Sequence, residues 1–137
     1  MFFKKKKYDF YLAGPMRGYP NLNKEMFTKM VKFLRLKGFT VWNPSEHTSY
    51  LKLSFAECMT LDLNMVICCC NKIAFLPGWR ESLGANMEAF AAFACGKEAI
   101  ELIPLVSGDV AIVSLNLTEY NLPYIVGETC RFDPHKT

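Results

Sequence analysis

Two acidic residues with apolar neighbours are the side chains of this sequence best suited to chemistry. Glu88 stands directly before a run of alanine and phenylalanine (89–94), and Asp62 lies among leucine, methionine and valine. A carboxylate in such surroundings tends to be partly desolvated and held in place, as a nucleophile or general base must be. If the two carboxyls meet in the fold, they supply the nucleophile and the proton donor of glycosidic chemistry. Taken singly, each also fits a solvated acidic residue on a helix.

A tyrosine is the third candidate for this group. Tyr11 falls near the end of the apolar segment 8–12, where its hydroxyl can donate a hydrogen bond to Glu88 and orient it. The alternative is a tyrosine that only fills the core.

Two segments rich in small residues have the composition of anion-binding loops. In the first, glycines let the backbone approach a ligand, and Arg17 offers a planar guanidinium suited to phosphate or carboxylate. In the second, Ser82 offers a hydroxyl and Gly84 an unobstructed N–H at a helix start, where the dipole favours an anion. Neither is a dinucleotide fingerprint or a P-loop, and alone each also fits a plain turn or an N-cap serine. The candidate binding residues are Gly14, Pro15, Met16, Arg17, Gly18, Ser82 and Gly84.

Alternating strands and helices must position these residues. Segments 8–12, 40–42, 72–76 and 99–103 have strand-like composition and are bounded by turn-forming residues. Helical spacing of apolar residues covers 23–37. Ser54 and Glu57 form a capping-box pattern that begins a second helix, which runs to about residue 66. A third helix begins at Ser82 or Gly84 and ends near residue 96.

This alternation predicts one α/β domain over residues 1–137. We expect a doubly wound parallel sheet, flavodoxin-like or Rossmann-like, with about five strands and helices on both faces. A fifth strand is expected at 110–115 and a short extra one at 124–126. Such sheets bind ligands at the carboxyl ends of their strands. The loops after the first and third strands should therefore face one pocket.

The composition argues against several other classes of protein. The chain has 137 residues, 51% apolar and 21% charged, which is typical of one globular domain. We expect no membrane association, because no apolar run approaches the roughly 20 residues that cross a bilayer. The net charge of +3 and the single basic run at 4–7 predict no nucleic-acid partner. The six cysteines form no C-x-x-C motif, so no zinc site is expected.

Several segments together resemble the nucleoside 2-deoxyribosyltransferase-like superfamily. The pattern is most similar to a small domain-of-unknown-function branch common in phages and bacteria, and it covers about residues 8–103. The matching segments are YLAGPMRGYPN (11–21), WNPSE (42–46), the helix around Asp62, FLPGW (75–79) and SLGANMEAFAAFACG (82–96).

The resemblance implies an enzyme that breaks the N-glycosidic bond between a base and its sugar. In the superfamily a glutamate on the helix after the third strand forms a glycosyl-enzyme intermediate, and Glu88 matches it. Tyr11 matches the superfamily tyrosine at the end of the first strand. Asp62 matches an aspartate that helps to protonate the departing base. The resemblance implies no metal and no organic cofactor.

Position 82 separates two branches of the superfamily. Transferases acting on free nucleosides carry an aspartate six residues before the nucleophile, whereas the 2′-deoxynucleoside 5′-phosphate N-hydrolases carry a serine that binds the 5′-phosphate. Ser82 and Arg17 match the hydrolases, and an aspartate would repel a phosphate dianion. Pro15 departs from their pattern, because a serine stands there in the hydrolases. The expected function is hydrolysis of a (deoxy)nucleoside 5′-monophosphate through a glutamyl intermediate.

Two other functions fit the same residues. One is base exchange by a nucleoside 2-deoxyribosyltransferase. The other is a non-catalytic nucleotide-binding or sequestering protein, against which the intact set of Tyr11, Asp62 and Glu88 argues. The resemblance further implies a homodimer or a higher homo-oligomer. The expected location is the cytoplasm, or the host cytoplasm if the protein is viral.

Overall fold

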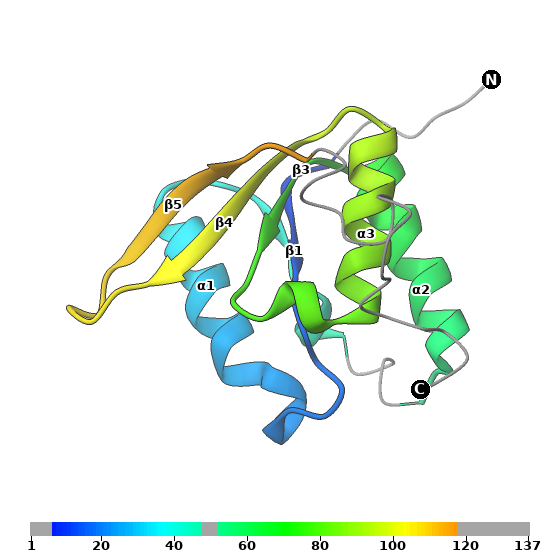
Figure 1. Ribbon diagram of the computed structural model, residues 1–137, viewed down its shortest axis with the longest axis horizontal. Helices are drawn as coiled ribbons and strands as arrows, with labels where there is room; N and C mark the ends of the chain where they lie inside the picture. Colours follow the sequence, from blue (N-terminus) through cyan, green and yellow to red (C-terminus); the bar gives the residue numbers. More distant parts are fainter. Residues whose placement is uncertain (1–6, 48–51, 118–137) are drawn as a thin grey trace, which may run out of the picture.

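The computed structural model describes residues 7–47 and 52–117, which form an α/β fold around one sheet. The sheet has the strand order β2-β1-β3-β4-β5 (Figure 1). Its strands are β1 (Tyr8–Ala13), β2 (Val41–Trp42), β3 (Cys70–Phe75), β4 (Glu98–Pro104) and β5 (Val110–Leu115). The neighbouring pairs β1–β2, β1–β3 and β3–β4 are parallel, as the alternation predicts. The expected strand at 124–126 lies outside the described residues.

The strand β5 departs from the all-parallel sheet because it runs antiparallel to β4. Residues 105–109 alone connect the two strands, whereas a parallel pair needs a crossover of about a dozen residues or more. Gly108 supplies a positive φ of 94° in the connection. The two strands form a long hairpin at one edge of the sheet (Figure 1).

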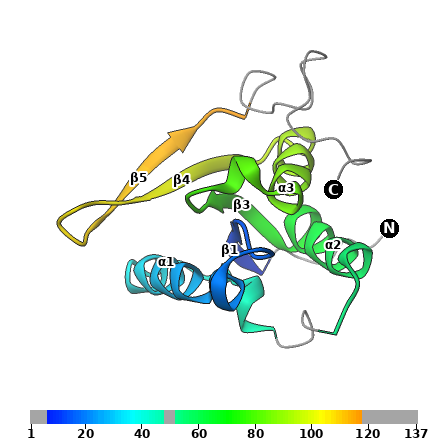
Figure 2. The same cartoon turned by 60° about the horizontal axis from the view of Figure 1, so that its bottom comes forward.

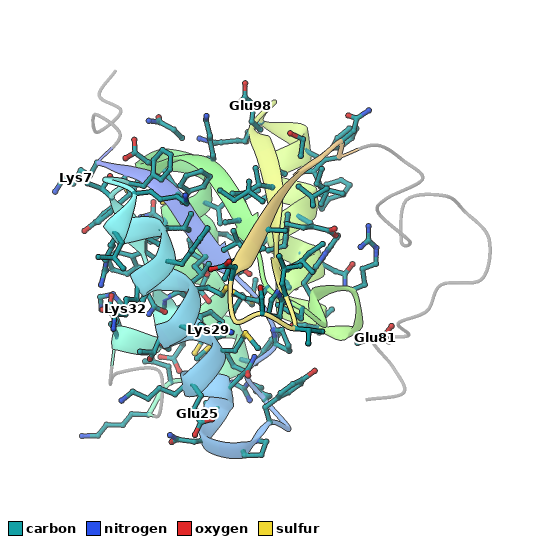
Figure 3. The ribbon with its side chains drawn as sticks, turned by 90° about the vertical axis from the view of Figure 1, so that its left-hand side faces the viewer. Lys7, Glu25, Lys29, Lys32, Glu81 and Glu98 are labelled. Atoms are coloured by element: carbon teal, nitrogen blue, oxygen red, sulfur yellow. The ribbon has the colours of Figure 1, made fainter. Side chains whose placement is uncertain are left out.

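Helices cover both faces of the sheet, as predicted. The helix α1 (Lys24–Leu36) lies on one face, and α2 (Phe55–Asn64) and α3 (Leu83–Ala94) lie together on the other (Figure 2). The exposed side chains of Glu25, Lys29 and Lys32 lie along α1 (Figure 3). Its buried side chains are Phe27, Met30, Val31 and Leu34, the apolar positions at helical spacing.

The pleat of β1 sends alternate side chains into two separate cores. Phe10 and Leu12 pack with the buried face of α1, whereas Tyr11 and Ala13 pack with residues of α3 and of the turn after α2. This period of two is a property of any strand. It places the Tyr11 hydroxyl on the side of the sheet where α2 and α3 lie.

The second helix begins as predicted and ends close to the predicted residue. Ser54 caps it and makes both hydrogen bonds of a capping box with Glu57. The regular helix ends at Asn64, and a π-helical turn, Met65–Cys69, leads directly into β3. Lys97 closes this turn by donating hydrogen bonds to the carbonyls of Ile67 and Cys70.

The carboxyl ends of the parallel strands lie together at one end of the molecule. Glu81, in the loop after β3, lies at that end, and Glu98, at the start of β4, lies at the opposite end (Figure 3). Among residues 7–47 and 52–117, no helix has the length and apolar character to cross a membrane. The loops after β1 and β3 are therefore the elements to examine for a site.

Candidate active site

A buried hydrogen bond joins β1 to α3. The Tyr11 hydroxyl donates to Oε2 of Glu88 at 2.5 Å. Both side chains are buried, with 1% and 5% of their surfaces exposed. Charge-assisted O–H···O bonds have this short length. The structure thus brings together the two residues that the sequence suggested as a carboxylate and its orienting group.

The carboxyl of Asp62 lies beside the same glutamate. Asp62 is on α2 and is also buried. Burial raises the pKa of Glu88 well above its ordinary value, and the negative charge of Asp62 and a hydrogen bond with its carboxyl act in the same direction. The hydrogen bond from Tyr11 opposes this shift, because it stabilises the ionised carboxylate. Two adjacent buried carboxyls share one proton more readily than they ionise together.

The N-terminus of α3 presents hydrogen-bonding groups about one turn before Glu88. Ser82 is the N-cap, and its Oγ accepts a hydrogen bond from the Ala85 N–H at 3.2 Å. The hydroxyl can still donate its own proton. Gly84 precedes Glu88 by four residues, so the two lie on the same face of the helix.

The loop after β1 owes its glycines to the fold. A Cβ on Gly14 would lie 2.8 Å from the Cβ of Leu76, which is fully buried. Gly18 has a φ of 82°, a conformation that favours glycine. Packing and turn geometry therefore account for both glycines without a ligand.

Arg17 leans from this loop toward α2. Its guanidinium lies over the Phe55 ring, 5.2 Å from the centroid, and hydrogen-bonds the thiol of Cys58. Among the residues that the structure describes, Arg17 forms no salt bridge with a carboxylate. Gly84 packs near the same Phe55 ring, since a Cβ there would lie 3.8 Å from its Cε2. A guanidinium that has no salt-bridge partner among the described residues thus lies close to the α3 N-terminus.

These groups line one cavity of about 720 Å³, a size typical of small-molecule sites. Nine of the ten sequence-predicted site residues line it, and Gly18 does not. The lining comprises Tyr11, Leu12, Gly14, Pro15, Met16, Arg17, Tyr19, Leu22, Pro44, Leu53, Phe55, Cys58, Met59, Asp62, Glu81, Ser82, Leu83, Gly84, Ala85 and Glu88.

Asn86 is a residue of this region that the motifs did not single out. Its side-chain amide donates to three backbone carbonyls, those of Trp79, Arg80 and Ser82, at 3.4, 3.0 and 2.8 Å. These bonds pin the loop that delivers Ser82 to the cavity. The signal available in the sequence was an asparagine near the start of an apolar helix of alanine and phenylalanine, where a buried amide needs hydrogen-bond partners.

Trp79 fixes the same loop from its other side. Its ring is 3% exposed and stacks on Phe75 with centroids 4.2 Å apart. Its Nε1 donates to Glu101 on β4 at 2.9 Å, and Arg80 forms a salt bridge with the same carboxylate at 3.0 Å. Trp79 does not line the cavity. The loop after β3 is therefore rigidly anchored, as a preorganised binding site requires.

The arrangement is suited to substitution at a carbon atom next to an anionic group. It offers one oriented carboxylate, one carboxyl able to hold a proton, a hydroxyl with open helix N–H groups, and a guanidinium. Apolar side chains from Met16, Leu53 and Met59 form other parts of the wall.

The comparison with known protein families covers most of this fold, up to the first half of β4. A family model described as a domain of unknown function (DUF4406) matches residues 8–101. The matched residues include β1 to β3, α1 to α3 and all ten sequence-predicted site residues. No curated protein matches the chain significantly. Because the family model matches more than half of the 137 residues, the chain belongs to the DUF4406 family.

Proposed function

We propose that the chain is an N-glycosidase that hydrolyses the base–sugar bond of a (deoxy)nucleoside 5′-monophosphate. The observation that carries the proposal is the buried contact of Tyr11 with Glu88 beside Asp62. These residues line a cavity that also receives the N-terminus of α3. A carboxyl pair with one shared proton contains both the nucleophile and the acid that N-glycosidic cleavage needs.

The proposed first step forms a covalent sugar–enzyme ester. A carboxylate oxygen of Glu88 bonds to C1′ of the sugar while the bond from C1′ to the base nitrogen breaks. The electron pair of that bond goes to the base, and Asp62 gives its proton to the base. The reactive form of the pair has Glu88 ionised and the shared proton on Asp62, and the hydrogen bond from Tyr11 stabilises that form against the net rise in the pKa of Glu88.

The second step consumes one water molecule. Asp62, which is now ionised, takes a proton from the water molecule while the oxygen of the water bonds to C1′. The ester bond to Glu88 breaks, and its electron pair returns to the carboxylate. The products are the free base and the sugar 5′-phosphate, and Asp62 has recovered its proton.

A positive charge and hydrogen-bond donors in the cavity support the proposed binding of the 5′-phosphate. Arg17 carries a cation with no carboxylate partner among the described residues. Ser82 and the N–H groups near Gly84 add donors at a helix N-terminus. Glu81 also lines the cavity, and its negative charge disfavours an anion beside it. The phosphate is therefore placed on the side of the cavity nearer Phe55 and Gly84.

Membership of the nucleoside 2-deoxyribosyltransferase-like superfamily is part of the proposal. It is supported by the order of the elements, with tyrosine on β1, aspartate on α2 and glutamate on α3. A homo-oligomeric assembly is likewise proposed on the resemblance, and analytical ultracentrifugation tests it.

A chromatographic screen tests the function. The wild type and Glu88→Gln are incubated with common and modified ribo- and deoxynucleoside 5′-monophosphates and with the matching nucleosides. We expect base release from monophosphates by the wild type and none by Glu88→Gln. Glu98→Gln, an exposed carboxyl at the other end of the molecule, is the matched control and should retain activity.

Each alternative has its own outcome in this screen. Appearance of a new nucleotide when a second free base is added would identify a base-exchanging transferase. Release from free nucleosides alone would contradict the phosphate assignment. Calorimetric binding of a monophosphate with no turnover would favour a binding protein and contradict catalysis.

A further inference from the structure

The chain between β1 and α1 makes one left-handed turn. Asn21, Leu22 and Asn23 have φ angles of 50°, 53° and 60°. In this conformation the Cβ of an L-residue crowds the following carbonyl oxygen, and residues adopt it singly rather than in runs. Asparagine tolerates the left-handed region, whereas leucine rarely occupies it. Strain of this kind persists where the surroundings hold it, and it occurs often at ligand sites.

Contacts to the loop after β1 hold the turn. The Leu22 N–H donates to the Tyr19 carbonyl at 3.1 Å. The side-chain amide of Asn23 donates to the Pro15 carbonyl at 2.9 Å. Asn23 is also the residue before α1, yet its side chain does not cap that helix, although asparagine is among the best N-caps. The Asn23 side chain thus bonds to Pro15, a residue of the cavity wall, and does not cap α1.

One residue of the turn lines the cavity. Leu22 lines it together with Tyr11 and Glu88, whereas its neighbours Asn21 and Asn23 do not. A glycine at position 22 would make the same turn without strain. The turn therefore does not require the leucine, and its place in the cavity wall suggests contact with a ligand.

We propose that Leu22 contacts the base of the bound nucleoside 5′-monophosphate and that the left-handed turn exists to hold it there. The inference rests on the proposed function. A leucine offers only apolar contact, and within a nucleotide the faces of the base are apolar while the phosphate and sugar hydroxyls are polar. Leu22 is thus a specificity residue for the part of the substrate that leaves.

Paired substitutions test this role by calorimetry in the Glu88→Gln background, where no substrate is consumed. The ligands are ribose 5-phosphate, which lacks a base, and the monophosphate from the screen's set that binds Glu88→Gln most tightly in calorimetry. Leu22→Gly should weaken monophosphate binding by roughly 10- to 100-fold, the worth of burying one leucine side chain. It should leave ribose 5-phosphate binding unchanged. The melting temperature should not fall, because the strain at position 22 is relieved.

Two further variants keep the test decisive. Asn21→Gly relieves strain in the same turn without altering the cavity wall, so it should bind both ligands as the parent does. Leu22→Asn keeps a residue that tolerates the turn and should weaken monophosphate binding as Leu22→Gly does. Leu22→Asn replaces Leu22→Gly as the test variant if the glycine variant folds poorly.

Different results overturn different claims. Monophosphate binding within about twofold of the parent in both Leu22 variants would overturn the contact, as would equal weakening of both ligands. A lower melting temperature for Leu22→Gly with unchanged affinity would make the turn purely structural. Binding that depends on Leu22, in a wild type that releases no base, would leave this inference standing and reject the hydrolase. Absence of binding by any monophosphate would reject both.

Discussion

The hydrogen bond between Tyr11 and Glu88 gives the most informative perturbation of the proposed mechanism. Tyr11→Phe removes one hydroxyl from a fully buried ring and keeps the ring itself. The lost bond is a 2.5 Å donation to a buried carboxylate. Hydrogen bonds to charged groups contribute about 1.5–3 kcal/mol. Because Tyr11 lowers the pKa of Glu88 against the effects of burial and Asp62, its removal raises that pKa further.

The expected consequence is both a slower reaction and a displaced pH profile. The reactive form has Glu88 ionised and Asp62 protonated, and losing the bond raises its free energy by about 1.5–3 kcal/mol, or about 10- to 150-fold in population. We expect kcat/KM for base release to fall by up to that factor. The loss of the bond raises the sum of the two pKa values of the carboxyl pair, so at least one limb of the pH profile should move to higher pH.

The assay is base release from the substrate found in the screen, measured across the pH range for wild type, Tyr11→Phe and Tyr8→Phe. Tyr8 lies on the same strand and packs edge-on against Trp42, so its variant controls for the loss of a tyrosine hydroxyl as such. A profile for Tyr11→Phe that is lower but not displaced would refute the reasoning, because it would mean that the tyrosine acts only through packing.

Three further predictions follow from the same region. Glu88→Gln should make the free energy of unfolding less dependent on pH. Burial disfavours the ionised form of Glu88, so the wild type is more stable at acid pH and loses this contribution as pH rises from the ordinary value of 4.5 through the raised pKa. Chemical denaturation at several pH values would contradict this if wild type and variant changed in parallel. Ser82→Asp should weaken monophosphate binding in calorimetry by tenfold or more, because aspartate repels phosphate. The melting temperature should stay similar, because aspartate also caps helices. Unchanged affinity would show that Ser82 is not part of the phosphate site. Gly14→Ala should lower the free energy of unfolding by about 1–3 kcal/mol, because its Cβ would overpack against Leu76. Gly84→Ala should lower it little, because its Cβ would lie 3.4 Å from the Met59 sulfur. Equal losses in urea denaturation would contradict the packing argument.

The sequence by itself determined the features that depend on near neighbours in the chain. The spacing of Phe27, Met30 and Val31 specified the buried face of α1, because a helix brings residues three and four apart onto one side. The capping pattern at Ser54 and the cap at Ser82 specified where α2 and α3 begin. The alternation of strands and helices specified a layered fold with a site at the strand ends, because these preferences act within a few residues.

The tertiary structure alone decided how the site residues meet. Tyr11 and Glu88 are 77 residues apart in the chain, and only the pleat of β1 and the packing of α3 against it bring them into contact. The raised pKa of Glu88 arises from burial and from a carboxyl on another helix. The left-handed turn that holds Leu22 runs against the local preference of leucine. Desolvation, charge proximity and tolerated strain depend on groups distant in sequence, so no local pattern of residue types specifies them.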